Sequence, residues 1–150
     1  MKRVKILFAV IFAVFTTGVW AQESDVSVLA GLEATVYKSP TCGCCTGYAE
    51  FLRKHGVEVR TVDTNDLSTV KAELNVPPET QSCHTVVIGD YVIEGHVPLG
   101  ALVKLFTEKP AIAGIGLPGM PMGTPGMEGP KSETYNVLSF GEGLELFYSE

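Results

Sequence analysis

Two short clusters of cysteine and histidine carry the clearest chemistry in this sequence. The first is the run Cys42-Gly43-Cys44-Cys45, and the second is Cys83-His84, with His96 further along the chain. Three cysteines within four residues exceed the two that a simple redox pair needs. Because thiolates and thioethers select Cu(I), the surplus of sulfur favours a site for a thiophilic metal, copper before others.

The same four cysteines allow other interpretations. Cys42 and Cys45 form a Cys-x-x-Cys motif and could be a redox-active pair, which leaves Cys44 surplus. Two structural disulfides are a further alternative, although any pair within the first cluster closes a very small ring. Four cysteines could also hold a [2Fe–2S] cluster, and zinc accepts the same donor types. Metal binding by the whole set is the interpretation that uses every sulfur.

The elements expected around the first cluster place it at a helix N-terminus. Residues 33–37 have the composition of a short strand, and residues 44–55 follow as a helix whose apolar face holds Tyr48, Phe51 and Leu52. Unpaired N–H groups and the partial positive charge at a helix N-terminus lower the pKa of nearby thiols. This position therefore suits thiolates, which act both as metal ligands and as nucleophiles.

The remaining pattern completes a recognisable order of elements. Asn65 or Asp66 could cap a second helix, with Leu67, Val70 and Leu74 as its apolar stripe. Further strands are expected over residues 57–62, 85–88 and 91–94, and further helices over residues 67–74 and 98–107. The order β-α-β-α-β-β-α is typical of a thioredoxin-like α/β fold, a mixed sheet with helices on both faces.

The second cluster argues against an ordinary disulfide exchanger. Compared with a thioredoxin or a glutaredoxin, residues 84–88 occupy the place of the cis-proline and the strand that follows it. The proline of those enzymes lies beside the cysteine pair and keeps metals away. Here Cys83 and His84 stand in that place and would face the first cluster, so a redox feature is lost and two ligands are gained.

Two further histidines have different prospects. His96 ends the hairpin nearest the same site, so it is a candidate ligand, with an ordinary exposed turn residue as the alternative. His55 ends the first predicted helix far from the cysteines and is expected to be structural, because a cationic side chain is favourable there.

Residues 111–130 are dominated by Gly and Pro and are expected to be an extended loop without helix or strand. The loop contains Met120, Met122 and Met127, and a final hairpin is expected to follow it over residues 135–148. Thioethers bind Cu(I) without losing a proton, so the methionines could be auxiliary ligands or line an entry path. The alternative is that they fill an apolar gap.

The N-terminus has the pattern of an export signal. Basic residues precede an apolar run over residues 6–19, and Val19 and Ala21 supply the small residues of a cleavage site after Ala21. The run is shorter than the ~20 residues of a membrane span, and an uncleaved anchor is the alternative. We expect a signal peptide over 1–21, a flexible segment over 22–32 and a copper-binding domain over 33–150, located in the bacterial periplasm.

The charge balance excludes one class of partner. The chain has 11 basic and 17 acidic residues, a net charge of −6. Loss of the export signal, which holds Lys2, Arg3 and Lys5, would leave 8 basic groups and a net charge near −9. An acidic protein without a basic patch repels phosphates, so no nucleic-acid partner is expected. No membrane partner is expected after cleavage either.

Four motifs combine in this chain. They are Thr41-Cys42-Gly43-Cys44-Cys45, Ser82-Cys83-His84-Thr85, Val92-Ile93-Glu94-Gly95-His96-Val97-Pro98, and Gly119-Met120-Pro121 followed by Gly126-Met127-Glu128. Together they resemble the CopG-like family of periplasmic copper-resistance proteins, formerly a domain of unknown function, over residues 33–148. The resemblance implies a thioredoxin-like fold that holds a cysteine-bridged cluster of several Cu(I) ions.

Carried over to this sequence, the resemblance implies a set of metal ligands. They are Cys42, Cys44, Cys45 and Cys83, with His84 and His96 as nitrogen ligands. The implied function is sequestration of Cu(I) in copper resistance and homeostasis, by a metal-binding protein rather than an enzyme. The alternative is a thiol-disulfide or copper-linked oxidoreductase that uses Cys42 and Cys45. The expected partners are copper ions and other periplasmic copper-handling proteins.

Overall fold

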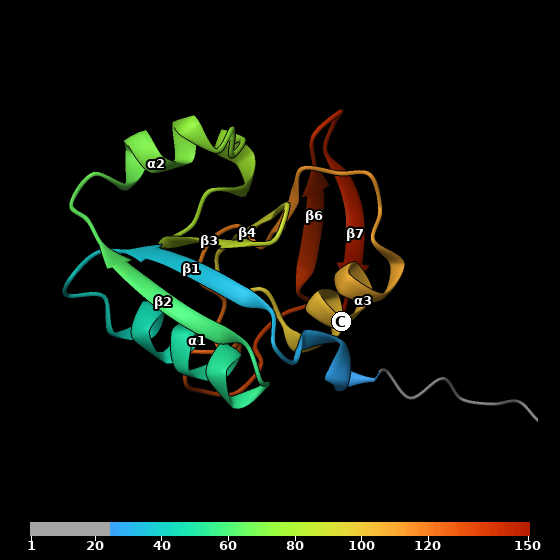
Figure 1. The fold of residues 1–150 in the computed structure, drawn as a ribbon, viewed down its shortest axis with the longest axis horizontal. Coiled ribbons are helices and arrows are strands. Elements are labelled where there is room, and N and C mark those ends of the chain that lie inside the picture. The colour runs from blue at the N-terminus through green and yellow to red at the C-terminus, as the bar shows by residue number, and fades with distance from the viewer. Residues whose placement is uncertain (1–24) are drawn as a thin grey trace, which may run out of the picture.

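Seven strands form one mixed sheet with helices against both of its faces (Figure 1). The computed structural model describes residues 25–150. Its elements are η1 (Val26–Leu29), β1 (Glu33–Lys38), α1 (Gly43–Lys54), β2 (Glu58–Asp63), α2 (Leu67–Glu73), η2 (Pro78–Thr80), β3 (His84–Ile88), β4 (Tyr91–Glu94), α3 (Leu99–Glu108), β5 (Gly114–Gly116), β6 (Asn136–Phe140) and β7 (Glu145–Ser149). The strands lie in the order β2-β1-β3-β4-β5-β6-β7.

The first four strands and the three α-helices follow the predicted order, so the thioredoxin-like prediction is confirmed. β1 and β2 are parallel and are joined by α1, while β3 and β4 form an antiparallel hairpin. In the register of β1 and β3, Lys38 lies opposite His84. The chain leaves β1 towards the first cysteine cluster and enters β3 from Cys83. This pairing therefore brings the two clusters to the same edge of the sheet.

α1 is held against the sheet by its apolar face. Tyr48, Ala49 and Leu52 are buried in one core together with Val36 and Val86 of the sheet. Burying a large apolar side chain stabilises a fold by roughly 1.5–3 kcal/mol, so this face fixes the helix and the cysteines at its start. The helix begins at Gly43, and Cys42 is its N-cap.

The prediction for α2 is wrong in one respect. Asp66 caps the helix as expected, because its carboxylate accepts the Thr69 N–H at 3.1 Å. The apolar stripe of Leu67, Val70 and Leu74 stays only half-buried, and Lys71 is buried instead. The physical reason lies in the sheet beneath the helix, which presents the polar side chains of Thr85 and Glu94 to Lys71.

The segment over residues 111–130 is not a loop throughout, so that prediction is also corrected. Gly114–Gly116 form β5, which pairs with β4 in parallel and with β6 in antiparallel orientation. A Cβ at Gly114 would lie 2.1 Å from the Val92 carbonyl oxygen and 2.6 Å from the Phe140 ring, so only glycine fits there. β5 connects the predicted C-terminal hairpin, β6 and β7, to the rest of the sheet.

The ordered unit also begins earlier than residue 33. Val26–Leu29 form η1, which Asp25 caps, and the Leu29 side chain is buried in the main core. The part of the expected flexible segment from Asp25 onward is therefore packed, whereas the predicted signal peptide lies outside the described residues. Among residues 25–150, the helices are too short or too polar to cross a bilayer.

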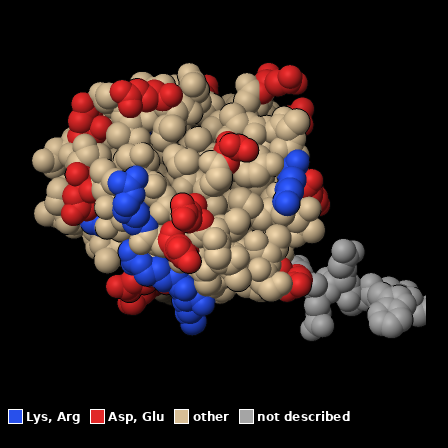
Figure 2. All heavy atoms as spheres, in the orientation of Figure 1, with Lys and Arg blue, Asp and Glu red and all other residues tan. Residues whose placement is uncertain are grey.

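Acidic side chains are spread over the face shown in Figure 2, with Lys and Arg beside them in a few places. This distribution is that of a solvated surface.

Candidate metal centre

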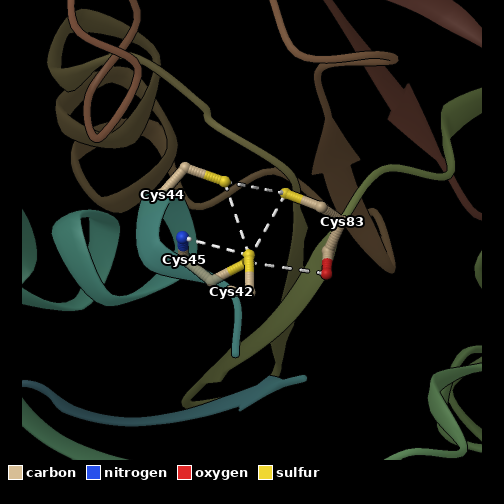
Figure 3. A group of neighbouring side chains, drawn as sticks. All are labelled: Cys42, Cys44, Cys45 and Cys83. Carbon is tan, nitrogen blue, oxygen red and sulfur yellow. Dashed lines mark hydrogen bonds between the residues drawn. A yellow bond between two sulfur atoms is a disulfide. The ribbon is translucent and has the colours of Figure 1, made fainter. Parts of the chain in front are cut away.

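The four cysteines meet at the N-terminus of α1 (Figure 3). Cys42, Cys44 and Cys45 come from the turn that starts the helix, and Cys83 reaches them from the segment before β3. The Sγ–Sγ distances are 3.4 Å for Cys42 and Cys44, 3.6 Å for Cys45 and Cys83, and 4.0 Å for Cys44 and Cys83. All four sulfur atoms lie within 4.8 Å of one another, which is close enough to share metal ions.

Two of these cysteines are joined in this structure. Cys42 and Cys45 form a disulfide, whereas Cys44 and Cys83 carry free thiols. The disulfide joins the pair that the Cys-x-x-Cys motif predicts. Because the thiolate is the metal ligand, this form offers a metal fewer strong sulfur donors than the reduced form would.

Helix geometry holds the first cluster in place. The Cys42 sulfur accepts the Cys45 N–H at 3.3 Å, and the Cys42 carbonyl accepts the Thr46 N–H at 3.2 Å. The Cys45 N–H is one of the otherwise unpaired donors of the first helical turn, whereas the Thr46 N–H makes the first bond within the helix. The partial positive charge of the helix start is thus directed at the sulfur cluster, and it favours negative charge on the sulfurs.

Cys83 is a protonated thiol in the metal-free site. Burial raises its pKa to about 12, and the neighbouring Cys44 adds to the shift. A soft metal that binds Cys83 must therefore displace a proton, so its affinity depends on pH.

His96 is buried and points its Nε2 atom at Cys83. Its Nδ1 lies 2.7 Å from the Pro125 carbonyl oxygen, and its Nε2 lies 3.1 Å from Cys83 Sγ. Because a carbonyl only accepts hydrogen bonds, Nδ1 must carry the proton, which leaves the Nε2 lone pair facing Cys83 in the neutral ring. Burial lowers the pKa of His96, so the neutral form is favoured. The alternative of an exposed turn residue is wrong.

His84 lies beside the same sulfur. Its Nδ1 is 3.4 Å from Cys83 Sγ, and its buried Nε2 has no hydrogen-bond partner. Burial, with smaller contributions from His96 and Lys71, lowers the pKa of His84 to about 3. The Tyr48 ring packs on the imidazole with centroids 4.6 Å apart. Both imidazoles are thus neutral near pH 7, which is the form that binds metals.

The loop after β5 that carries Met120, Met122 and Met127, called the methionine loop below, covers the site with its backbone. Pro125 supplies the carbonyl that holds His96, and a Cβ at Gly126 would lie 2.5 Å from the Cys44 carbonyl oxygen. Met120 and Met122 are 52% and 43% exposed, and Met127 is half-buried. The structure therefore leaves two of the three candidate thioethers facing solvent.

His55, predicted to be structural, lies away from the cluster. Its Nδ1 is 2.8 Å from the Phe51 carbonyl oxygen at the end of α1. The residue-type patterns missed the Pro125 carbonyl and a buried carboxylate, Glu94, that accepts the Ser82 N–H beside Cys83. Glu94 lies in one of the four motifs, but a carboxylate is almost never fully buried unless it is paired, so its residue type gave no signal for a buried role.

Comparison with known proteins identifies the family. The family model described as "Protein of unknown function, DUF411" matches residues 80–127. Two solved structures, both titled copper resistance protein CopG, are similar over the whole fold. Form 2 has a TM-score of 0.74 and form 1 a TM-score of 0.73. Each is 35% identical, and the match covers 80% of this chain and 98% of that chain.

No curated protein matches the chain. The solved structures contribute the decisive comparison, because their match extends over nearly the full length of those proteins. With that identity and coverage, the chain belongs to the CopG-like family of copper resistance proteins.

Proposed function

We propose that this protein sequesters Cu(I) as a cluster of several ions bridged by the thiolates of Cys42, Cys44, Cys45 and Cys83. The observation that carries the proposal is the convergence of four sulfur atoms within 4.8 Å of one another. Soft thiolates select Cu(I), and one ion would leave part of such a set unused. Sulfurs this close can each bridge more than one ion.

The two imidazoles add nitrogen ligands on one side of the sulfur group. Cys83, His84 and His96 form a second group whose ligand atoms lie within 4.8 Å of one another, and Cys83 belongs to both groups. The neutral rings need no deprotonation, in contrast to the Cys83 thiol. We propose that His84 and His96 complete the coordination of ions bound through Cys83.

Full loading requires reduction of the Cys42–Cys45 disulfide. A dithiol reductant supplies two electrons and two protons, the S–S bond breaks, and the reductant becomes a disulfide. Each thiol then releases its proton as it binds Cu(I). We propose that the exposed thioethers of Met120 and Met122, together with the half-buried Met127, are auxiliary ligands on the path by which the ion enters.

The setting proposed for this function is the bacterial periplasm, after cleavage of a signal peptide over residues 1–21. The copper-binding domain would then span residues 33–150 together with the packed η1 segment. The proposed partners are copper ions and other periplasmic copper-handling proteins that deliver or receive them. The names of the related structures support a role in copper resistance.

A thiol-disulfide or copper-linked oxidoreductase is the second candidate. It is favoured by the Cys42–Cys45 disulfide, which joins the two residues that such an enzyme would use. Replacing Cys44 and Cys83 by Ser separates the two functions. An oxidoreductase that uses Cys42 and Cys45 keeps its exchange activity in this variant, whereas the copper cluster is lost.

The first test is anaerobic loading of the reduced, signal-free protein with Cu(I), followed by elemental analysis and a thiol count. About three or more ions per chain with all four thiols protected would support a thiolate-bridged cluster. At most one ion, with Cys42 and Cys45 free to exchange, would favour the oxidoreductase. A red-brown protein containing iron would indicate a [2Fe–2S] cluster instead.

A further inference from the structure

A buried ion pair lies across the sheet from the cysteines, under α2. We propose that Glu94, held by Lys71, is a positioning residue that fixes the segment carrying Cys83 and so places the Cys83 sulfur in the site. The inference rests on the proposed function for its purpose, since a placed sulfur matters most to a shared metal site. Its geometric content can be tested without metal.

Both carboxylate oxygens of Glu94 accept hydrogen bonds. The carboxylate is fully buried, and its Oε1 pairs with the Lys71 ammonium and accepts the Ser82 N–H at 2.6 Å. Its Oε2 accepts the Thr85 hydroxyl at 2.7 Å, and Lys71 also donates to Thr85 Oγ1 at 2.9 Å. The hydrogen bond from the Ser82 N–H thus connects the buried ion pair to the residue before Cys83.

Stability alone does not explain this pair. Removing two charges from water costs several kcal/mol per ion, and apolar residues of similar size often stabilise a fold equally well. Apolar side chains on α2 remain half-exposed while Lys71 is buried. A buried, fully bonded polar group instead specifies one geometry. Here that geometry is the path of the backbone into β3.

The segment before β3 has few other restraints. Residues 81–83 belong to no helix or strand, so their position depends on side-chain contacts. Ser82 Oγ donates to the Gly119 carbonyl, and a Cβ at Gly95 would lie 2.7 Å from Ser82 Cβ, so glycine is needed at that position. The Glu94 bond holds the Ser82 backbone from the other side. Cys83 follows directly, 3.1 Å from His96 Nε2 and 3.6 Å from Cys45 Sγ.

The test compares two variants of equal charge in the full-length protein. Lys71→Met/Glu94→Gln keeps an oxygen that can accept the Ser82 N–H, whereas Lys71→Met/Glu94→Leu removes it. Neither leaves a buried charge unpaired, so both should fold, with the Leu variant less stable because it leaves the Ser82 N–H without its acceptor. Thr85→Val is the matched control, because it removes a bond within the cluster and leaves the Ser82 bond intact.

The metal-free readout is the equilibrium with glutathione of a Cys45–Cys83 disulfide, formed in a Cys42→Ser/Cys44→Ser background. This equilibrium constant measures how often the two sulfurs meet. The Leu variant is expected to lower it at least tenfold relative to the Gln variant, or about 30 mV. With all cysteines restored, Cu(I) affinity measured by competition is expected to fall by about 10- to 100-fold in the Leu variant only.

Equal disulfide equilibria in folded Gln and Leu variants would overturn the inference. If the Leu variant does not fold, Glu94→Asp replaces it, since it keeps the charge for Lys71 but draws the carboxylate back by one methylene. It should weaken the disulfide equilibrium relative to wild type, and an unchanged value would equally overturn the inference. Absence of copper binding by the wild type would contradict the proposed function and leave the metal-free readout as the test of Glu94.

Discussion

The two sides of the cysteine site are built in different ways. On one side, Cys42, Cys44 and Cys45 lie within a single helical turn that the capping bonds of α1 organise locally. On the other side, the adjacent Cys83 and His84 and the more distant His96 come from two segments, which are held by Glu94 and by the Pro125 carbonyl. The local side therefore needs only its own helix, whereas the distant side depends on the whole fold.

This difference predicts that the distant side is the more sensitive to substitution. Cys83→Ser is expected to have the largest effect, because Cys83 belongs to both groups of ligands. The number of Cu(I) ions bound per chain should fall to one or none, as measured by elemental analysis after anaerobic loading. Cys44→Ser is the matched control on the local side and should retain more copper. Equal losses of bound Cu(I) in the two variants would contradict the predicted difference between the two sides of the site.

The methionine loop tests the same contrast through the backbone. Gly126 has a φ of +82° and its missing Cβ would meet the Cys44 carbonyl, so Gly126→Ala should destabilise the protein by at least about 2 kcal/mol. It should also weaken the hydrogen bond from His96 to Pro125. Gly43→Ala is the control, because apart from its chain neighbours and the backbone of its own helix no atom lies within 4 Å of its Cβ position, and it should stabilise α1 by about 0.5 kcal/mol. Denaturant unfolding of the reduced, metal-free proteins measures both effects.

Because the imidazoles of His84 and His96 are buried, we expect the stability of the distant side to decrease in acid. The pKa of His84 is lowered from 6.5 to about 3, so the unfolded chain binds a proton below pH 6.5 that the folded protein does not. Above pH 6.5 the neutral His84 side chain can be buried at no cost in proton binding. This contribution to the free energy of unfolding is lost as the pH falls from 6.5 towards 3. The free energy of unfolding should therefore decrease by up to about 1.4 kcal/mol per pH unit for this residue. Unfolding curves between pH 7 and pH 5 measure the slope.

A variant with Gln in place of both His84 and His96 sharpens this prediction, since it should flatten the slope over that pH range. A slope that persists in the variant would assign the effect to other groups.

The smallest effect is expected for the exposed methionines. Met120→Ala/Met122→Ala should change stability by less than about 0.5 kcal/mol, because both side chains are on the surface. If they serve only as an entry path, the equilibrium affinity for Cu(I) stays within about twofold while the loading rate falls. Stopped-flow transfer of Cu(I) from a chelator measures that rate. A large loss of affinity would make them permanent ligands.

The sequence patterns predicted the local side better than the distant side. Helical periodicity and the capping position of Cys42 follow from neighbouring residues, so the start of α1 could be placed within a residue. β5 could not be predicted, because Gly114 is selected by the close approach of Val92 and Phe140 and not by strand propensity. The burial of Lys71 and Glu94 was missed because it too depends on contacts between residues that are distant in the sequence. Each charge is tolerated only because the other lies across a tertiary contact.

The order of the first elements was predictable because each has its own hydrophobic period, and the thioredoxin-like topology then brought Cys83 to the cysteine turn. The bond from His96 to Pro125 had no such signal. A backbone carbonyl can be supplied by any residue, so its role is visible only once the loop has been placed.

The Cys42–Cys45 disulfide has a consequence for how storage would respond to its surroundings. Oxidation withdraws two donors, yet the thiols of Cys44 and Cys83 and both imidazoles stay in place. Under the proposed function, the oxidised protein therefore still binds some copper through these remaining ligands. Its capacity would rise in steps with the supply of reducing equivalents, so the amount of copper retained would reflect the electron supply of the compartment as well as its copper content.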